Sequence, residues 1–318
     1  MRTLREPAKA AAPPSDWSQA RERSSLWVLR LMAWIATTLG RPIARGVLHP
    51  ITLYFLLFAP GPRRESARYL ARALGRPARF SDLYRHVHSF ASTVLDRVYL
   101  VRGQLSAFDI TQQGLDPLDA TVAEGRGAVL LGAHIGSFEV LHATGESRPG
   151  MRVAMVMYPD NARMIQDVLQ SIAPKMHLDV ISIGRSGSTL EIRDWLDAGG
   201  ITGLLADRFL PTSSGRGGIT ALPFLGAPAH FSDGPLRLAM LLRRRVFFMV
   251  GLYRGGNRYE VSFKVLADFS QPIDTAAQRE AALQAALVAY VAQLESLCRE
   301  APYNWFNFHD FWRSDPPA

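Results

Sequence analysis

His134 and Glu139 are the two residues whose types and spacing suggest chemistry. His134 follows the short apolar run 128–131, which is flanked by glycines and is typical of a fully buried strand. The residues from about Ser137 onward suit a helix. We therefore expect the pair at a strand-loop-helix junction, the position at which open α/β sheets bind ligands.

The chemistry that this pair suggests is general base catalysis. A neutral imidazole accepts a proton from a hydroxyl or amine best when a carboxylate holds its second ring nitrogen. Glu139 is the carboxylate within reach. The chain has no G-x-S-x-G nucleophile motif, and residues 184–188 do not match one, so direct activation of the substrate is favoured over a covalent intermediate. A purely structural histidine-carboxylate pair is the alternative.

A second buried run, 201–206, also delivers polar residues to the end of a strand. Asp207 and Arg208 follow it directly. If this strand ends at the same sheet edge as His134, Arg208 would bind a phosphate or polarise a thioester carbonyl. Asp207 is predicted to orient Arg208 rather than to act as an acid.

The sequence His134-x-x-x-x-Glu139 resembles the H-x4-D/E motif of the lysophospholipid and lipid A acyltransferase superfamily. The closer resemblance is to the lauroyl and myristoyl transferases of lipid A assembly. Later parts of the chain support it: the consecutive blocks 222–228 and 234–239 resemble F-F-G-x-P followed by G-P-x-x-L-A, and 302–313 resembles the aromatic ending of these enzymes.

The resemblance implies an activity and the residues that serve it. His134 would be the general base and Glu139 its orienting partner. Phe224 and Gly226 would contact the substrate, and the glycine-rich loop 213–218 would close over the acyl chain. The donor would be a thioester on acyl carrier protein or coenzyme A, and the acceptor would be a lipid hydroxyl. No metal and no cofactor are implied.

Composition limits the classes of partner. The chain has 318 residues, 48% of them hydrophobic, which is enough for one large domain with appendages. Its one cysteine, Cys298, excludes an internal disulfide and a thiolate metal cluster. The net charge is +8, and nearly all of the positively charged residues are arginines. This charge suits a phosphate-bearing lipid or an acidic carrier protein as partner. A GC-rich genome explains the preference for arginine equally well. Nucleic acid is rejected as a partner because no nucleic-acid-binding motif is present.

The chain is predicted to have three parts. Residues 1–23 form a disordered lead without the apolar core of a secretion signal. Residues 24–60 form membrane-associated apolar helices. Their two apolar segments, 26–39 and 46–59, are too short as helices to cross a hydrocarbon core of about 30 Å, so they are expected to lie in the membrane interface or, alternatively, against the protein's own core. Residues 61–318 form the catalytic domain, which the resemblance implies is at the cytoplasmic face of the bacterial inner membrane.

Strands and helices alternate after the central motif, which is typical of βαβ units and a largely parallel sheet. A further pair of strands follows as an antiparallel hairpin. The predicted fold class is therefore α/β, with a mixed, largely parallel sheet flanked by helices, as the resemblance to glycerolipid acyltransferases also implies. The predicted strands are 152–158, 180–183, 201–206, 246–252 and 259–265, and helices are predicted at 161–172 and 188–198.

Other segments carry residues with open roles. A core helix is predicted from about Ser81, with His86 and His88 as surface or packing residues. Thr275 is predicted to open a helix through a capping box. Residues 243–245, three arginines, are predicted to end a helix and to form a patch for a carrier protein or a membrane.

The predicted function is that of a membrane-associated acyltransferase that moves a fatty acyl group to a hydroxyl of a lipid A-like or other outer-membrane lipid. Ser137-Phe138 stands where the family has Asn-Trp, and Arg208 stands where it has Gln. Because of these departures, the resemblance does not determine which lipid is the acceptor. The alternatives are an acyltransferase of an aryl polyene or other specialised lipid pathway, and a non-catalytic membrane lipid-binding scaffold.

Overall fold

A computed structural model describes Trp34, Ala36, Thr38 and residues 40–146, 151–159, 179–208 and 218–312. The predicted lead 1–23, the helix 161–172 and nearly all of the loop 213–218 lie outside the described residues, as does most of the segment 26–39.

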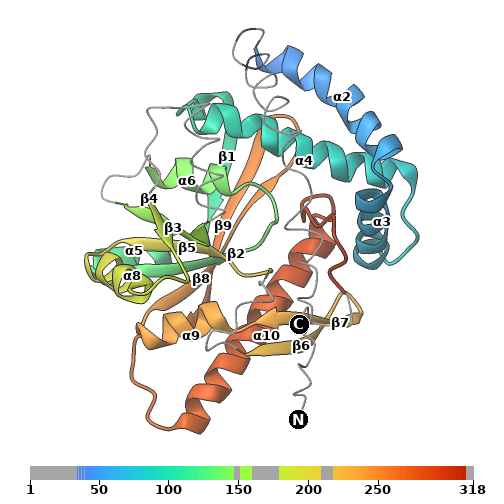
Figure 1. Cartoon of the computed structure of the whole chain (residues 1–318). Helices are drawn as coiled ribbons and strands as arrows, with labels where there is room; N and C mark the ends of the chain where they lie inside the picture. The colour runs from blue at the N-terminus through green and yellow to red at the C-terminus, as the bar shows by residue number, and fades with distance from the viewer. Residues whose placement is uncertain are drawn as a thin grey trace, which may run out of the picture.

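A seven-stranded sheet forms the centre of the molecule (Figure 1), with the strand order β1-β9-β8-β2-β5-β3-β4. From β8 to β4 all neighbours are parallel, whereas β9 runs antiparallel to β8 and β1 runs parallel to β9. The prediction of a mixed, largely parallel sheet is confirmed. The strands are β1 (Asp109–Gln113), β2 (Ala128–Gly132), β3 (Val153–Met157), β4 (Asp179–Ser182), β5 (Ile201–Leu205), β8 (Arg245–Tyr253) and β9 (Arg258–Asp268).

Helices flank the sheet, and a separate hairpin of β6 (Ile219–Phe224) and β7 (Ala227–Ser232) lies beside it. The longest helix among the described residues, α10, begins at the predicted capping box, in which the Thr275 side chain accepts a hydrogen bond from the Gln278 amide. The helices are α2 (Arg41–Phe58), α3 (Pro60–Leu74), α4 (Phe80–Leu100), the short 3-10 helix η2 (Leu105–Ala107), α5 (Asp116–Ala123), α6 (Phe138–Glu146), α8 (Ser188–Asp197), α9 (Gly234–Leu241) and α10 (Ala276–Glu300).

Strand β2 is buried along its whole length because both of its faces are covered. Val129 and Leu131 belong to the apolar cluster that includes the buried side of α10. Ala128 and Leu130 belong to the cluster that includes buried residues of α2, α4 and α6. Two covered faces explain why the sequence has a continuous apolar run here rather than an alternating one.

The arginines at 243–245 do not end a helix, and that prediction is wrong. Helix α9 stops at Leu241, Arg243 has a positive φ of 53°, and Arg245 already belongs to β8. The Arg244 side chain is buried against Asp197 and the Arg126 carbonyl, while Arg245 is paired with Asp268 and Glu124. Because carboxylates already neutralise these two side chains, the segment is a poor candidate for a carrier or membrane patch.

Candidate active site

Neighbouring strands bring His134 and Asp207 together. Strands β2 and β5 are parallel partners, with Gly132 opposite Leu205, so both end at the same edge of the sheet. His134 follows β2 by two residues and Asp207 follows β5 by two residues. The condition set in the sequence analysis, that the two strands end at the same edge, is met, and the consequence is a direct contact between their polar residues.

Asp207 holds His134 through two hydrogen bonds. Its Oδ1 lies 2.8 Å from His134 Nδ1, and its Oδ2 accepts the His134 backbone N–H at 3.0 Å. A carboxylate can only accept, so the ring proton lies on Nδ1 and the lone pair on Nε2. The Asp207 side chain is 1% exposed and that of His134 is 34% exposed. The arrangement gives a buried orienting carboxylate and an accessible base, which corrects the prediction that Asp207 orients Arg208.

The environment of Asp207 favours its charged form. Burial acts to raise the pKa of Asp207, but the charge and hydrogen bond of His134 oppose it, as do the charge of Arg208 and the hydrogen bond from Trp305. The pKa of this carboxyl group therefore lies well below its ordinary value. A carboxylate that stays ionised stabilises the imidazolium formed when His134 takes up a proton.

Glu139 is not the residue that orients His134, and that part of the prediction is wrong. Helix α6 begins at Phe138, which places Glu139 in its first turn. The Glu139 carboxylate forms an ion pair with Arg97 of α4 at 2.6 Å and accepts a hydrogen bond from Ser137 Oγ at 3.0 Å. Both carboxylate oxygens are thus engaged, one by an arginine of α4 and one by the loop itself.

Arg208 ties the end of β5 to the C-terminal segment. Its Nη2 donates to the Phe306 carbonyl at 3.1 Å. Burial lowers the pKa of Arg208, and the charge of Asp207 raises it in part. The guanidinium lies next to the His134-Asp207 pair and has donors beyond the one given to Phe306. Its predicted role as a ligand for a phosphate or an oxyanion stays a prediction.

Phe224 and Gly226 lie in the β6-β7 hairpin, not around His134. The Phe224 side chain is completely buried and packs against Phe231, Trp305 and Trp312. It has no surface to offer an acyl chain, so the prediction of a direct contact is wrong. Gly226 has a φ of 81° and turns the hairpin, a conformation that favours glycine.

The C-terminal segment supplies the part of the site that sequence reasoning missed. Trp305 donates its indole Nε1–H to Asp207 Oδ2 at 3.1 Å. The Phe306 amide donates to the His134 carbonyl at 2.8 Å, and the Gly136 amide donates to the Asn304 carbonyl at 2.8 Å. The aromatic side chains of this segment pack against one another and against Tyr69 and Phe224, while its polar atoms hold the loop that carries His134. The only signal for this in the sequence was the resemblance of block 302–313.

Gly136 permits the loop to pass close to the sheet. Its φ is 69°, and a Cβ there would lie 2.1 Å from the Gly251 carbonyl oxygen. The next amide, that of Ser137, donates to that same oxygen at 2.8 Å.

Backbone donors for an anion are limited near His134. The amides of Gly136 and Ser137 already donate to carbonyl groups, which leaves the first amides of α6 as the backbone donors. Among the described residues, no group of three or more His, Cys, Asp or Glu side chains is placed to hold a metal.

Acid should destabilise the fold through the buried residue His86. Burial lowers the pKa of His86 from 6.5 to about 4. Between these values the unfolded chain binds a proton that the folded chain does not, so the free energy of unfolding is at its full value above about pH 6.5 and falls as the pH drops towards about 4. His86→Gln should remove up to about 1.4 kcal/mol per pH unit of that slope, measured by urea unfolding across the window. Burial also lowers the pKa of His309 to about 4, so the His86→Gln variant should keep the part of the pH dependence of unfolding that is due to His309.

Comparison with known proteins agrees with the chemistry of the site. A family model described as bacterial lipid A biosynthesis acyltransferase matches residues 18–314. No curated protein matches the chain. The match covers every element described above.

Proposed function

The chain belongs to the bacterial lipid A biosynthesis acyltransferase family and is an acyltransferase, and from this premise we propose that it moves a fatty acyl group from a thioester to a hydroxyl of a lipid A-like acceptor. The observation that carries the proposal is the His134-Asp207 pair. His134 Nδ1 lies 2.8 Å from Asp207 Oδ1, and His134 Nε2 has the lone pair that can accept a proton. A base of this kind activates a hydroxyl directly.

The proposed reaction uses Nε2 of His134 twice. First it removes the proton of the acceptor hydroxyl while that oxygen attacks the thioester carbonyl carbon, and a tetrahedral oxyanion forms. The carbon-sulfur bond then breaks, and the leaving sulfur takes the proton from Nε2. The products are an ester and a free thiol. Asp207 stabilises the imidazolium between the two steps.

Charge in the transition state develops on the carbonyl oxygen of the thioester. Arg208 and the first amides of α6 are the donors proposed to stabilise it, since the amides of Gly136 and Ser137 are already used. The proposed donor is acyl carrier protein, an acidic partner that suits the net charge of +8, with acyl coenzyme A as the alternative.

Lipid analysis tests the proposed function. Total lipids are compared by mass spectrometry from cells with the gene, cells without it, and cells with the gene encoding His134→Ala. We expect one lipid class to lose a single acyl chain in both mutant strains, which identifies the acceptor. Loss from a lipid outside the lipid A class would move the acceptor to a specialised pathway, and unchanged profiles together with intact lipid binding would favour the non-catalytic scaffold.

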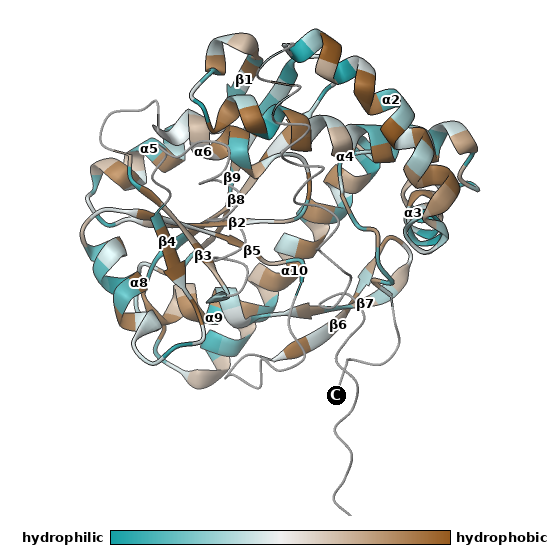
Figure 2. Ribbon diagram, turned by 45° about the horizontal axis from the view of Figure 1, so that its top comes forward, coloured by the Kyte–Doolittle hydropathy of each residue, from teal (hydrophilic) through white to brown (hydrophobic). Residues whose placement is uncertain are grey.

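Helix α2 is the proposed membrane-binding element. The side chains of Leu53, Tyr54, Phe55, Leu57 and Phe58, here called the α2 patch, are all exposed although all are apolar or aromatic, and Phe58 is 69% exposed. Helix α2 lies at the rim of the molecule, away from the sheet, and carries apolar residues coloured brown in Figure 2. An exposed group of this size marks an interaction site on a protein surface.

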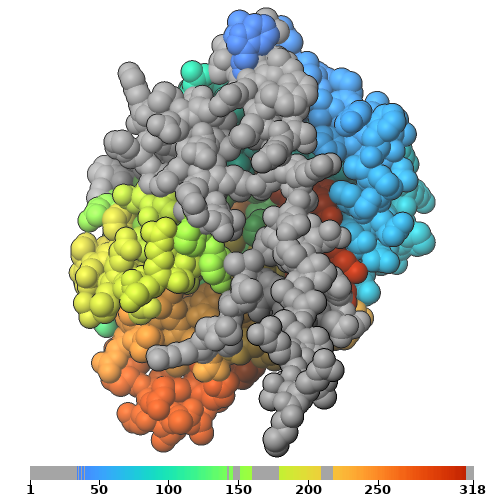
Figure 3. Space-filling view, viewed as in Figure 1, coloured from blue at the N-terminus to red at the C-terminus, as the bar shows by residue number. Residues whose placement is uncertain are grey.

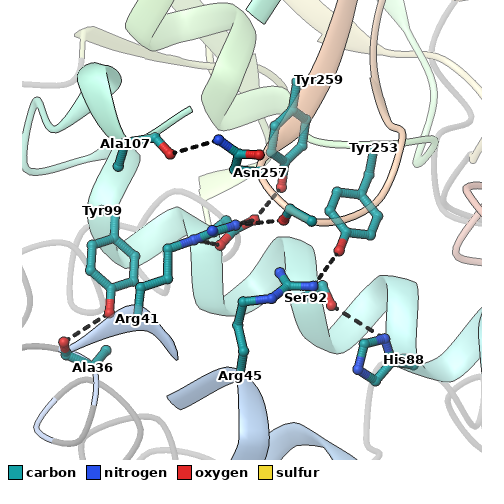
Figure 4. Close-up of polar contacts among 12 residues, drawn as sticks. Ala36, Arg41, Arg45, His88, Ser92, Tyr99, Ala107, Tyr253, Asn257 and Tyr259 are labelled. Carbon is teal, nitrogen blue, oxygen red and sulfur yellow. Dashed lines mark hydrogen bonds and ion pairs between the residues drawn. The ribbon is translucent and has the colours of Figure 1, made fainter. Parts of the chain in front are cut away.

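The opposite side of α2 is fixed to the protein by polar contacts (Figure 4). Arg41 forms a bidentate pair with the buried Asp96, whose Oδ2 also accepts from the Tyr259 hydroxyl. Arg45 donates to the Tyr253 hydroxyl. Because these contacts hold one side of the helix inward, the α2 patch points away from the core and suits the apolar part of a bilayer interface.

An exposed arginine follows the end of α2. Helix α3 begins after a bend of 96°, and its Arg64 is exposed, whereas Arg68 is already paired with Glu65 and Asp310. The two helices line one side of the molecule in blue in Figure 3. Apolar residues beside arginines fit a membrane with anionic headgroups, and we place it at the cytoplasmic face of the inner membrane.

Among the described residues, one helix is long and apolar enough to cross a membrane, or two if a bent pair counts as one span. By length and composition α10 passes as one, as do α2 and α3 taken together as a bent pair. However, Leu287, Tyr290 and Leu294 of α10 are buried in the core, so the apolar side of this helix packs against the rest of the protein.

Charge in the α2 patch should weaken membrane binding. Leu57→Glu and Phe58→Glu each remove an apolar side chain from the interface, and the partition coefficient should fall about ten-fold or more. The measurement is co-sedimentation with vesicles of phosphatidylethanolamine and phosphatidylglycerol. The matched control is Leu241→Glu at the end of α9, where the side chain is 71% exposed and no loss is expected. Equal loss in the control would contradict the assignment of the patch.

A further inference from the structure

His86 is a fully buried histidine of α4 that the chemistry above does not use. Its side chain is 0% exposed. Its Nδ1 lies 2.7 Å from Ser66 Oγ of α3, and its Nε2 lies 2.8 Å from the Trp305 carbonyl oxygen. A buried imidazole with both nitrogens engaged is held in one orientation.

The protonation of His86 follows from its partners. A carbonyl oxygen only accepts, so Nε2 carries the proton and donates to Trp305. The ring is neutral near pH 7 because burial lowers its pKa to about 4. Nδ1 therefore has a lone pair, which accepts the hydroxyl proton of Ser66. Both hydrogen bonds have a fixed direction.

Trp305 carries this constraint to the active site. Its carbonyl is held by His86, and its indole N–H donates to Asp207 at 3.1 Å. The Trp305 ring is 1% exposed and packs edge-on against Tyr69 and Phe224. The same residue forms an isolated antiparallel bridge with Ile135, next to His134. The two polar ends of Trp305 thus link helix α4 to the carboxylate that holds the base.

We propose that His86 is a positioning residue for acyl transfer: it fixes the Trp305 backbone so that the indole N–H holds Asp207 and, through Asp207, the ring of His134. The inference rests on the proposed function, since it needs His134 to be the base. His86 touches no reacting atom. Without the His86 donor, the Trp305 carbonyl would keep only the local hydrogen bond from the Asn307 amide at 2.8 Å. The C-terminal segment would then lose the hydrogen bond that ties it to α4, and it would shift.

The size of the effect follows from geometry. The path runs His86, Trp305, Asp207, His134, with each contact between 2.8 and 3.1 Å. A displacement of about 1 Å at a reacting group costs up to about 100-fold in rate. A partial displacement passed through two intermediate residues is expected to lower kcat about ten-fold, with little change in KM, because neither His86 nor Trp305 contacts substrate in this mechanism.

A matched pair of variants tests the proposal. His86→Gln keeps an N–H donor near the position of Nε2, whereas His86→Met has nearly the same length and no donor. His86→Met should lower kcat about ten-fold with KM within about two-fold, and His86→Gln should restore most of kcat. Trp305→Phe, which removes only the indole donor, should also lower kcat, and the double variant His86→Met with Trp305→Phe should be no slower than the slower single variant.

The outcomes separate this inference from the proposed function. Wild-type protein and His134→Ala are assayed alongside with acyl carrier protein thioester, and folded protein is quantified by thermal unfolding. Equal kcat for the Met and Gln variants, or independent losses that multiply in the double variant, would show that His86 is only structural. Absence of transfer by the wild type would instead overturn the proposed function.

Discussion

Replacing His134 with alanine should lower kcat for acyl transfer by about 10²- to 10⁴-fold. The variant loses the nitrogen that takes the acceptor proton and later returns it to the leaving sulfur, whereas the carboxylate of Asp207 and the donors around it stay in place. The effect should fall on kcat rather than KM, because the base acts in the transition state. The measurement is single-turnover transfer from a labelled acyl thioester to the acceptor that the lipid analysis identifies.

Two controls make this result interpretable. His134 is 34% exposed, but its ring hydrogen-bonds the buried Asp207, so thermal unfolding measures the folded fraction of the variant and kcat is expressed per folded protein. His134→Gln, which has an amide in place of the ring, should be as slow as the alanine variant because an amide is not a base near neutral pH. A loss of less than about ten-fold in kcat would count heavily against direct base catalysis.

The fold class was predictable from sequence because the signals were local. The apolar run 128–131 lies between glycines and proved to be β2, a strand covered on both faces. The capping box at Thr275 marked the start of α10. Strand β1 was not predicted because it is short and largely exposed at the sheet edge. The hairpin of β6 and β7 was missed since its sequence also suits an irregular loop with a proline-glycine turn.

The candidate site was only half predictable, and the reason is the order of strands. His134 could be identified from its place after a buried strand. Its partner Asp207 is 73 residues away and depends on β5 lying next to β2, which the sequence does not state. Glu139 was chosen because it is near in sequence, but α4 supplies Arg97 to its carboxylate. Trp305, further along still, was recognisable only as an aromatic block.

Helix α2 was predicted either to lie in the membrane interface or to pack against the protein's own core, and only its packing can be compared with the structure. Ala44 and Leu48 are buried in the core cluster shared with α4, as the packing alternative predicted. The α2 patch is exposed at the other end of the helix, and its contact with a membrane stays a prediction. The period of the apolar residues does not distinguish the two because the C-terminal half is apolar on nearly all sides.

Asp207→Asn should be nearly as damaging as loss of the base, with a fall in kcat of about 10²- to 10⁴-fold. Oδ2 of Asp207 accepts from both the His134 amide and the Trp305 indole. In the variant the amide oxygen must take this place, so its NH₂ group faces Nδ1 of His134. That nitrogen would then have to accept, its proton would move to Nε2, and the lone pair needed for catalysis would be lost.

Comparing Glu139→Gln with Asp207→Asn shows which of the two carboxylates orients His134. The Glu139 carboxylate is bound by Arg97 and Ser137, and no hydrogen bond or ion pair joins it to His134 among the described residues, so kcat should stay within about ten-fold of the wild type. The two variants are assayed with the same donor and acceptor after thermal unfolding has verified the folded fraction of each. If Glu139→Gln abolished transfer while Asp207→Asn retained it, the orienting role would return to Glu139. With the expected order, the residue that makes His134 a base is the one that β5 delivers.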